Sequence, residues 1–120
     1  MKNKKLKNWC IETKNKLEEN KTYPEKAFKY YLLKNKINFE TQKLIIAKKN
    51  KVYFLDFYLP DYSIAIEIDG KYHSTEEQIK KDIEMDLDLQ KIGIKTFRIT
   101  NKQVLTGKYN LNQILKLNGK

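Results

Sequence analysis

The sequence predicts an α/β domain in which helices flank a mixed four-stranded sheet. Two helical segments carry sharp N-terminal signals, three strand-like segments follow one another with short turns, and one further strand follows the second helix. An antiparallel meander of three strands, a helix and a fourth strand together form a mixed α/β layer. The 120 residues suit one domain, which we expect over residues 22–120, after a basic arm or short helix over residues 1–21.

The first capped helix is predicted over residues 24–36. Thr22 and Glu25 have the spacing of a capping box, and Pro24 suits the first turn of a helix. A shorter helix before it, over about residues 9–19, has few apolar positions. The predicted domain therefore begins with one well-defined helix.

The second capped helix is predicted over residues 75–91, because Ser74 and Glu77 repeat the capping-box spacing. Apolar residues recur every four positions on one face of this helix, at Ile79, Ile83 and Leu87. Met85, Leu89 and Ile92 widen that face. Gly93 suits the C′ position that ends such a helix. Two short helices, over about residues 101–105 and 110–117, are predicted to close the chain.

Four segments are rich in β-branched and aromatic residues and are predicted to be strands: residues 40–47, 51–59, 63–69 and 94–99. A lysine-rich turn over residues 48–51 joins the first two strands. Pro60 and Asp61 mark the turn into the third strand. The first three strands are therefore expected to pair as an antiparallel meander.

Three acids stand inside this apolar part of the sequence, where charged carboxylates cost stability unless something positive compensates them. In the second strand, alternation places Asp56 on the face of Phe54 and Tyr58, with Leu55 and Phe57 on the other. The position of this acid among apolar neighbours calls for a partner.

In the third strand, Ala65, Glu67 and Asp69 share one face, opposite the isoleucines. A turn centred between residues 61 and 62 would set Asp56 directly opposite Glu67, where like charges destabilise a sheet. Either one carboxyl keeps a proton with a raised pKa, or a hard divalent cation lies between them. The alternative is that these acids face solvent or pair with lysines.

A magnesium ion, with manganese as a substitute, would take oxygen ligands from Asp56, Glu67 and the carbonyl of Ile68. Such an ion polarises a phosphodiester, helps to deprotonate an attacking water and stabilises the leaving oxygen. Carboxylates for a metal and lysines for phosphate are the combination that a nuclease needs. The residues themselves therefore suggest metal-assisted phosphodiester hydrolysis.

The charge of the chain is uneven. The formal net charge is +10, and residues 1–50 hold fourteen lysines against five acids, which gives +9 for that half and +1 for residues 51–120. A polyanion is the natural partner of the first half, and nucleic acid is favoured over a membrane surface. The alternative is that abundant lysine reflects base composition and solubility.

No apolar run approaches the roughly 20 residues of a membrane span. The first residues hold no apolar stretch of signal-peptide length, so we expect a cytoplasmic protein without a membrane partner. Cys10 is the only cysteine, which fits a reducing compartment.

Three spaced motifs resemble a known group of nucleases. They are D-F-Y-x-P from Asp56 to Pro60, E-x-D-G-x-x-H from Glu67 to His73, and then the single positions Asp82, Gly93 and Arg98. This pattern, over about residues 22–105, resembles the small nucleases related to very-short-patch-repair (Vsr) endonucleases, in the PD-(D/E)XK superfamily. That group includes phage and intron-encoded homing endonucleases with an EDxHD signature.

The resemblance implies a restriction-endonuclease-like core and a metal-dependent DNA endonuclease, in a bacterial or phage-infected cell. It assigns site roles to six residues: Asp56 as the central aspartate, Glu67 as the second acidic ligand, Glu25 as the helical glutamate, His73 and Asp82 as the histidine and helical aspartate, and Gln42 as a glutamine near the site. Asp69 stands where the superfamily usually has a lysine. Vsr relatives also lack that lysine, so its absence does not exclude activity. His73 is therefore our candidate for activating water.

Some of these residues have structural alternatives. Glu25 also fits a helix cap, Gln42 a structural role, and Arg98 an acid pair as well as a phosphate contact. The residues expected to contact DNA are Lys4, Lys5, Lys7, Lys43, Lys71, Tyr72 and Arg98. A homodimer and a monomeric nickase are both compatible with the sequence. The main rival function is a DNA-binding module that keeps the nuclease fold without cleavage, and a third is an RNA-directed basic protein.

Overall fold

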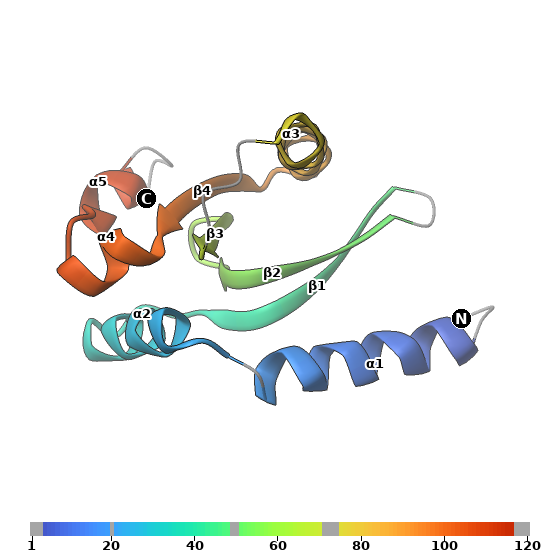
Figure 1. Ribbon diagram of the computed structural model, residues 1–120, viewed down its shortest axis with the longest axis horizontal. Coiled ribbons are helices and arrows are strands. Elements are labelled where there is room, and N and C mark those ends of the chain that lie inside the picture. Colours follow the sequence, from blue (N-terminus) through green and yellow to red (C-terminus); the bar gives the residue numbers. More distant parts are fainter. Residues whose placement is uncertain (1–3, 20, 49–50, 71–74, 117–120) are drawn as a thin grey trace.

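The computed structural model describes residues 4–19, 21–48, 51–70 and 75–116. Its elements follow the predicted order (Figure 1): α1 (Lys4–Glu19), α2 (Tyr23–Lys34), β1 (Glu40–Lys48), β2 (Lys51–Leu59), β3 (Ile64–Asp69), α3 (Glu76–Lys91), β4 (Lys95–Thr100), α4 (Asn101–Thr106) and α5 (Leu111–Lys116). The largest difference from the sequence prediction is α1, which begins about five residues earlier than expected.

The four strands form one mixed sheet in the order β1-β2-β3-β4. Strands β1, β2 and β3 pair antiparallel, and β4 lies parallel to β3 because α3 carries the chain back across the sheet. Figure 1 shows α3 on one side of the sheet and α1 and α2 on the other. The predicted fold class, a mixed four-stranded sheet flanked by helices, is confirmed.

The helix caps explain where α2 and α3 begin. Thr22 and Glu25 form the predicted capping box of α2. In α3 the cap is Thr75, whose side chain accepts the amide of Gln78. The predicted cap, Ser74, lies outside the described residues. Ser74 and Thr75 are adjacent in the sequence, and both carry the hydroxyl that an N-cap needs.

The end of α3 is as predicted. Gly93 has φ +85°, a left-handed conformation that favours glycine. The amide of Ile94 donates to the carbonyl of Leu89, and that of Gly93 donates to Gln90, which is the Schellman pattern. Both Leu89 and Ile94 are buried, so the helix end is closed by hydrogen bonds and by an apolar contact.

Two apolar clusters cover the two faces of the sheet. The α2-side cluster contains Phe28, Leu32, Phe57, Leu59, Ile64, Ile66, Ile99, Val104, Leu111 and Leu115. The smaller α3-side cluster contains Leu55, Ala65, Leu89 and Ile94, with Ile45, Tyr53, Tyr58 and Met85 packed against it. Ala65 therefore faces α3 while its neighbours Ile64 and Ile66 face α2, as the alternation of β3 predicted.

The predicted alternation is wrong in β2. Leu55 packs in the α3-side cluster, whereas Phe57, two residues later, packs against Phe28 of α2. Phe54 contacts Trp9 of α1. The facing of β2 changes at Asp56, because the strand pairing is locally irregular there, as described below.

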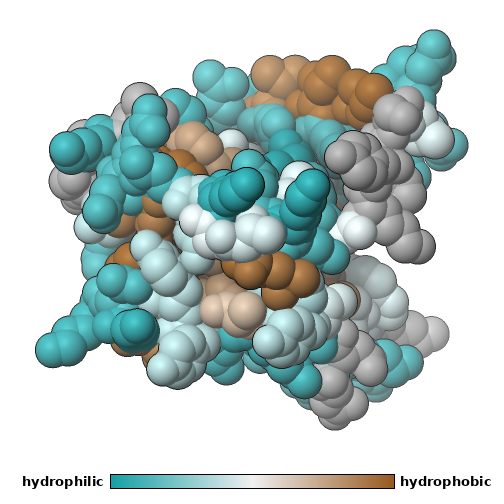
Figure 2. Space-filling view, turned by 60° about the vertical axis from the view of Figure 1, so that its left-hand side comes forward, coloured by the Kyte–Doolittle hydropathy of each residue, from teal (hydrophilic) through white to brown (hydrophobic). Residues whose placement is uncertain are grey.

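The predicted apolar face of α3 is divided in the structure. Met85 and Leu89 face the sheet, but Ile79, Ile83 and Leu87 are 45%, 53% and 52% exposed. Figure 2 shows apolar surface at the top of the molecule, where α3 lies. Polar bonds from the sheet to α3, described below, fix which side of the helix faces inward.

Among the described residues, no helix has both the length and the apolar character to cross a lipid bilayer.

Candidate active site

Asp56 and Glu67 meet between β2 and β3. The antiparallel register of β2 and β3 pairs Phe57 with Ile66, Tyr58 with Ala65 and Leu59 with Ile64. Asp56 and Glu67 are one step further along this register. The turn begins at Leu59, whose carbonyl accepts the amide of Tyr62 at 3.1 Å. The juxtaposition predicted from the turn is therefore confirmed.

Two side-chain bonds connect these strands at the point where the acids meet. The amide of Asp56 donates to Oε2 of Glu67 at 2.8 Å, and the amide of Ile68 donates to Oδ2 of Asp56 at 2.9 Å. Bonds from an amide to a charged carboxylate are stronger than bonds between neutral groups. Each acid thus holds the backbone of the strand opposite, and both side chains are half-buried.

Burial raises the pKa of both carboxyls. The pKa of Asp56 rises to about 6, mainly by desolvation and further by the charges of Glu25 and Asp69, although the bonds from Ile68 and Gln42 oppose the rise. Desolvation and then the charge of Asp56 raise the pKa of Glu67 well above its ordinary value. At neutral pH the pair therefore concentrates negative charge that is costly without a cation.

Gln42 lies on the other side of Asp56, in β1. Thr41 pairs with Phe57 and Lys43 with Leu55, so Gln42 falls opposite Asp56, yet the two are not a paired position of the ladder. The backbone of Gln42 has φ +47°, its side chain is 2% exposed, and it bonds to the Asp56 carboxyl. A non-glycine residue in this conformation is strained, and such strain is common at functional sites.

Gln42, for which the sequence suggested a structural role, lies beside the Asp56 carboxyl in the structure. The strand pattern of residues 40–47 contains no glycine or proline to signal an irregular backbone. Besides the family resemblance, the signal in the sequence was a polar amide in an apolar strand, at the position opposite Asp56. That signal needs the register of β1 and β2, which the sequence does not specify at this point.

Glu25 approaches the same site from the first turn of α2. Its Oε1 accepts the amide of Thr22 at 3.1 Å and the Thr22 hydroxyl at 2.9 Å, which completes the capping box. Its charge is also close enough to raise the pKa of Asp56. Capping and proximity to the acids therefore coexist in one side chain. Asp69 contributes charge to the same group, since it raises the pKa of both Asp56 and Glu67.

Arg98 of β4 is the neighbour of Glu67 in the parallel pairing. Its guanidinium donates two bonds of 2.9 Å to the carboxylate of Asp86 and lies 3.8 Å from Asp82. Its positive charge lowers the pKa of Glu67. Asp82 also accepts a bond from Gln78 at 3.0 Å. The acid pairing of Arg98 is therefore the arrangement that the structure shows, and its DNA contact stays a prediction.

The positions of the other residues predicted to contact DNA neither support nor oppose that role. Lys43 pairs with Glu40 at 3.3 Å, and Lys7 is exposed on α1, whose first turn contains Lys4 and Lys5. Three predicted residues lie outside the described residues: Lys71, Tyr72 and His73.

The donors around Asp56 suit a hard cation in chemical type. The two carboxylates offer oxygen, the ligand that magnesium prefers. The amide of Ile68 bonds to Asp56, and metal binding by the Ile68 carbonyl stays a prediction. Within residues 4–19, 21–48, 51–70 and 75–116, no group of three or more acids, histidines or cysteines is placed to hold a metal. The described part therefore presents two acidic ligands.

Comparison with solved structures finds a nuclease. The chain matches the catalytic domain of the homing endonuclease I-Bth0305I with a TM-score of 0.54 and 25% sequence identity, over 82% of this chain and 88% of that chain. A comparison with curated proteins gives no match. A family model described as "Restriction endonuclease PvuRts1 I-like, N-terminal" matches residues 10–117. Since this match spans most of the sequence, the chain belongs to the PvuRts1I-like restriction endonuclease N-terminal family.

Proposed function

We propose that this protein is a metal-dependent DNA endonuclease that hydrolyses phosphodiester bonds, within the Vsr-like branch of the PD-(D/E)XK nucleases. The observation that carries the proposal is the convergence of Asp56 and Glu67 from neighbouring strands, with a raised pKa for each carboxyl. Membership of a restriction endonuclease family and the likeness to a homing endonuclease catalytic domain support it.

Each residue of the site has a task in this proposal. Asp56 and Glu67 would hold magnesium or manganese, which supplies Lewis-acid polarisation of the phosphodiester when bound. Gln42 holds the Asp56 carboxyl in place, and Glu25 and Asp69 add negative charge beside it. His73, with Asp82, is proposed to move protons at the scissile phosphate.

The charges of the helices favour approach of DNA from one side. Helix α1 has five lysines and three glutamates, and α2 has three lysines and one glutamate, so each carries +2. Helix α3 has six acids and three lysines, which gives −3. A polyanion is therefore attracted more strongly to the α1 and α2 side of the sheet than to α3.

Conversion of supercoiled plasmid to nicked or linear DNA, measured with and without magnesium, tests the proposal. Asp56→Asn should abolish magnesium-dependent nicking but leave binding to DNA intact, since it removes a ligand charge and keeps an acceptor for Ile68. Asp61→Asn is the matched control, because Asp61 is exposed in the turn at the end of the same strand. Equal loss of binding and nicking in Asp56→Asn would make Asp56 structural rather than catalytic.

A DNA-binding module without cleavage is the second candidate. It is favoured by one observation, that each of the two carboxylates already accepts a backbone amide. A protein that binds plasmid but leaves it supercoiled at every magnesium and manganese concentration would establish this alternative. Single nicks would indicate a monomeric nickase, and linear product a homodimer or two successive cuts.

A further inference from the structure

The outer face of α2 exposes two aromatic side chains with lysine between them. Tyr23 is 73% exposed and Tyr30 is 67% exposed, and Lys26 lies between them along the helix. Positions three and seven residues apart fall on one side of a helix. The opposite side of α2 holds Phe28 and Leu32, which are fully buried. The two tyrosines therefore add nothing to the core.

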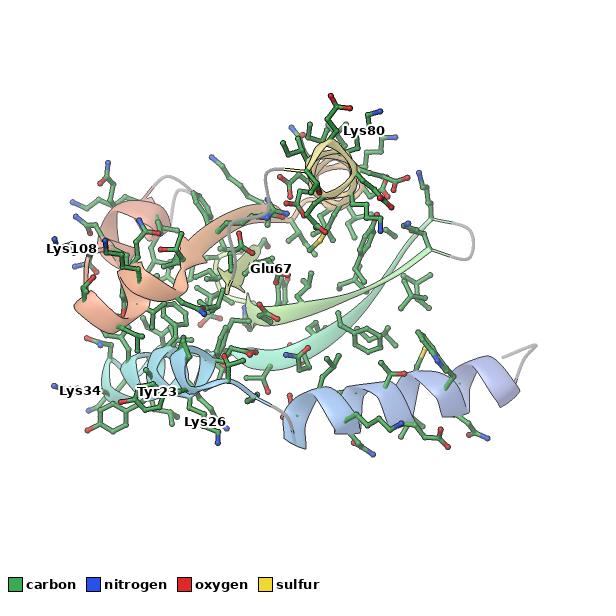
Figure 3. The ribbon with its side chains drawn as sticks, viewed as in Figure 1. Tyr23, Lys26, Lys34, Glu67, Lys80 and Lys108 are labelled. Carbon is green, nitrogen blue, oxygen red and sulfur yellow. The ribbon has the colours of Figure 1, made fainter. Side chains whose placement is uncertain are left out.

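The same face continues to the end of the helix. Leu33, 58% exposed, and Lys34, also exposed, follow the tyrosines. We call Tyr23, Lys26, Tyr30, Leu33 and Lys34 the outer face of α2. In Figure 3, Tyr23 and Lys26 lie on the side of α2 that points away from the sheet and from Glu67. The face therefore looks outward from the molecule.

The charge of this face indicates the class of its partner. Lys26 and Lys34 stand beside the tyrosines, and both α2 and the neighbouring α1 are positive, whereas α3 on the other side of the sheet is negative. Basic side chains interleaved with exposed aromatic rings are the arrangement that binds single-stranded nucleic acid: the lysines contact phosphates and bases stack on the rings.

The outer face starts next to the candidate active site. Glu25, whose charge reaches Asp56, and Tyr23 lie in the same turn of α2 but on opposite sides of the helix. A strand passing from the acids to Tyr23 must therefore curve around a helix that is roughly 10–12 Å across. Duplex DNA, with a persistence length of about 150 base pairs, resists such a curve, whereas a single strand follows it.

We propose that the outer face of α2 binds an unpaired DNA strand next to the cleavage position, and that the substrates include DNA with a single-stranded flank. Tyr23 and Tyr30 are seven residues apart, which spans about 10 Å along a helix axis. That distance corresponds to about three stacked bases at ~3.4 Å each. Bases stack on the two rings, Lys26 contacts the phosphate between them, and Lys34, one turn beyond Tyr30, contacts the phosphate that follows. This inference rests on the proposed nuclease function.

Binding of a fluorescent 20-nucleotide single strand, and of the matching duplex, in EDTA separates this face from catalysis. The variant Tyr23→Ala/Tyr30→Ala should bind the single strand at least about tenfold more weakly, because stacking on both rings is lost. Duplex binding should change less than about twofold. Tyr23→Phe/Tyr30→Phe keeps both rings and should bind as the wild type does. Ile79→Ala/Ile83→Ala, on the exposed side of α3, is the matched control for loss of surface apolar area.

Two results would overturn the inference. One is unchanged single-strand binding in the alanine variant, with the circular dichroism spectrum of a folded protein. The other is equal weakening for single strand and duplex, which would remove the preference for unpaired bases. In a further outcome, the wild-type protein fails to nick plasmid with magnesium while the alanine variant still loses single-strand binding. That pair of results would refute the endonuclease function and leave this face established as a single-strand binding surface, so the two failures are distinguishable.

Discussion

Asp56 and Glu67 each bind the backbone opposite: the Asp56 amide donates to Glu67, and the Asp56 carboxylate accepts the amide that follows Glu67. This exchange replaces ordinary ladder bonding with charge-assisted bonds and brings two half-buried carboxylates together. The arrangement stabilises the strand pairing through hydrogen bonds and destabilises it through desolvation and like charge. The raised pKa of both acids shows that the unfavourable effects are larger.

The first prediction concerns stability and pH. The pKa of Asp56 is about 6 in the folded protein against an ordinary 3.8. Between these values the folded state binds more protons than the unfolded state, so the free energy of unfolding falls as pH rises from about 4 to 6 and stays low above 6. The shift corresponds to at most about 3 kcal/mol. Asp56→Asn, which has no charge to bury, should therefore unfold several degrees higher than the wild type at pH 7.5, by differential scanning calorimetry.

The control for this experiment is the pH at which the difference disappears. Near pH 4 the wild-type carboxyl is protonated, so the two proteins should unfold at nearly the same temperature. Comparing the two proteins at each pH cancels titrating groups that do not interact with Asp56, such as Asp88, whose pKa is lowered by its bond from Tyr53. Glu67 does not cancel, because the charge of Asp56 raises its pKa and the variant removes that charge. An asparagine variant less stable than the wild type at pH 7.5 would contradict the raised pKa.

The second prediction concerns the pH dependence of cleavage. A proton and a metal ion compete for the same carboxylate, so ligands must lose protons before metal binds. At limiting magnesium, the nicking rate should rise steeply through pH 6, the pKa of Asp56, and continue to rise as Glu67, whose pKa is also raised, loses its proton. Raising the magnesium concentration should move the midpoint of this rise to lower pH. Initial rates of plasmid nicking in constant-ionic-strength buffers measure this, and a rate independent of pH through 6 would contradict it.

The third prediction separates the backbone of Gln42 from its side chain. Glycine accepts a φ of +47° without strain, so Gln42→Gly should retain a melting temperature close to that of the wild type. It should nick DNA at least about tenfold more slowly, because Asp56 loses the bond that positions it. Gln42→Ala keeps the strain and loses the bond, so it should lose both stability and activity. A glycine variant that nicks at the wild-type rate would assign Gln42 a structural role alone.

Much of the fold follows from local sequence signals. The capping box at Thr22, the turn at Leu59 to Tyr62 and the glycine at position 93 each fix the end of an element through short-range chemistry. The juxtaposition of Asp56 and Glu67 was predictable for the same reason, since a tight turn sets the register of the strands that it joins.

The parts that the sequence did not predict depend on contacts between distant elements. The change of face at Asp56 lies opposite the strained backbone of Gln42, in a different strand. The orientation of α3 is set by two bonds from the sheet, Arg98 to Asp86 and Tyr53 to Asp88, so its regular isoleucine stripe faces outward. Periodicity alone identifies an apolar face but does not say which side the tertiary structure buries.

The last prediction tests Arg98, for which the structure shows an acid pair and the sequence also suggested phosphate. Arg98 holds Asp86 through two bonds with a side chain that is 23% exposed, and Asp82 is nearby. Arg98→Ala leaves these acids without their cation and should cost about 2 kcal/mol of stability, less than for a fully buried pair. Arg98→Lys should recover less than half of that loss, because an ammonium cannot make the two parallel bonds.

Lys81→Ala, which breaks the exposed pair with Glu77, should cost less than about 0.5 kcal/mol and serves as the control. Urea unfolding measures all three variants. An Arg98→Ala protein with wild-type stability, but with a salt dependence of DNA binding reduced by about one counterion, would instead assign Arg98 to the phosphate backbone.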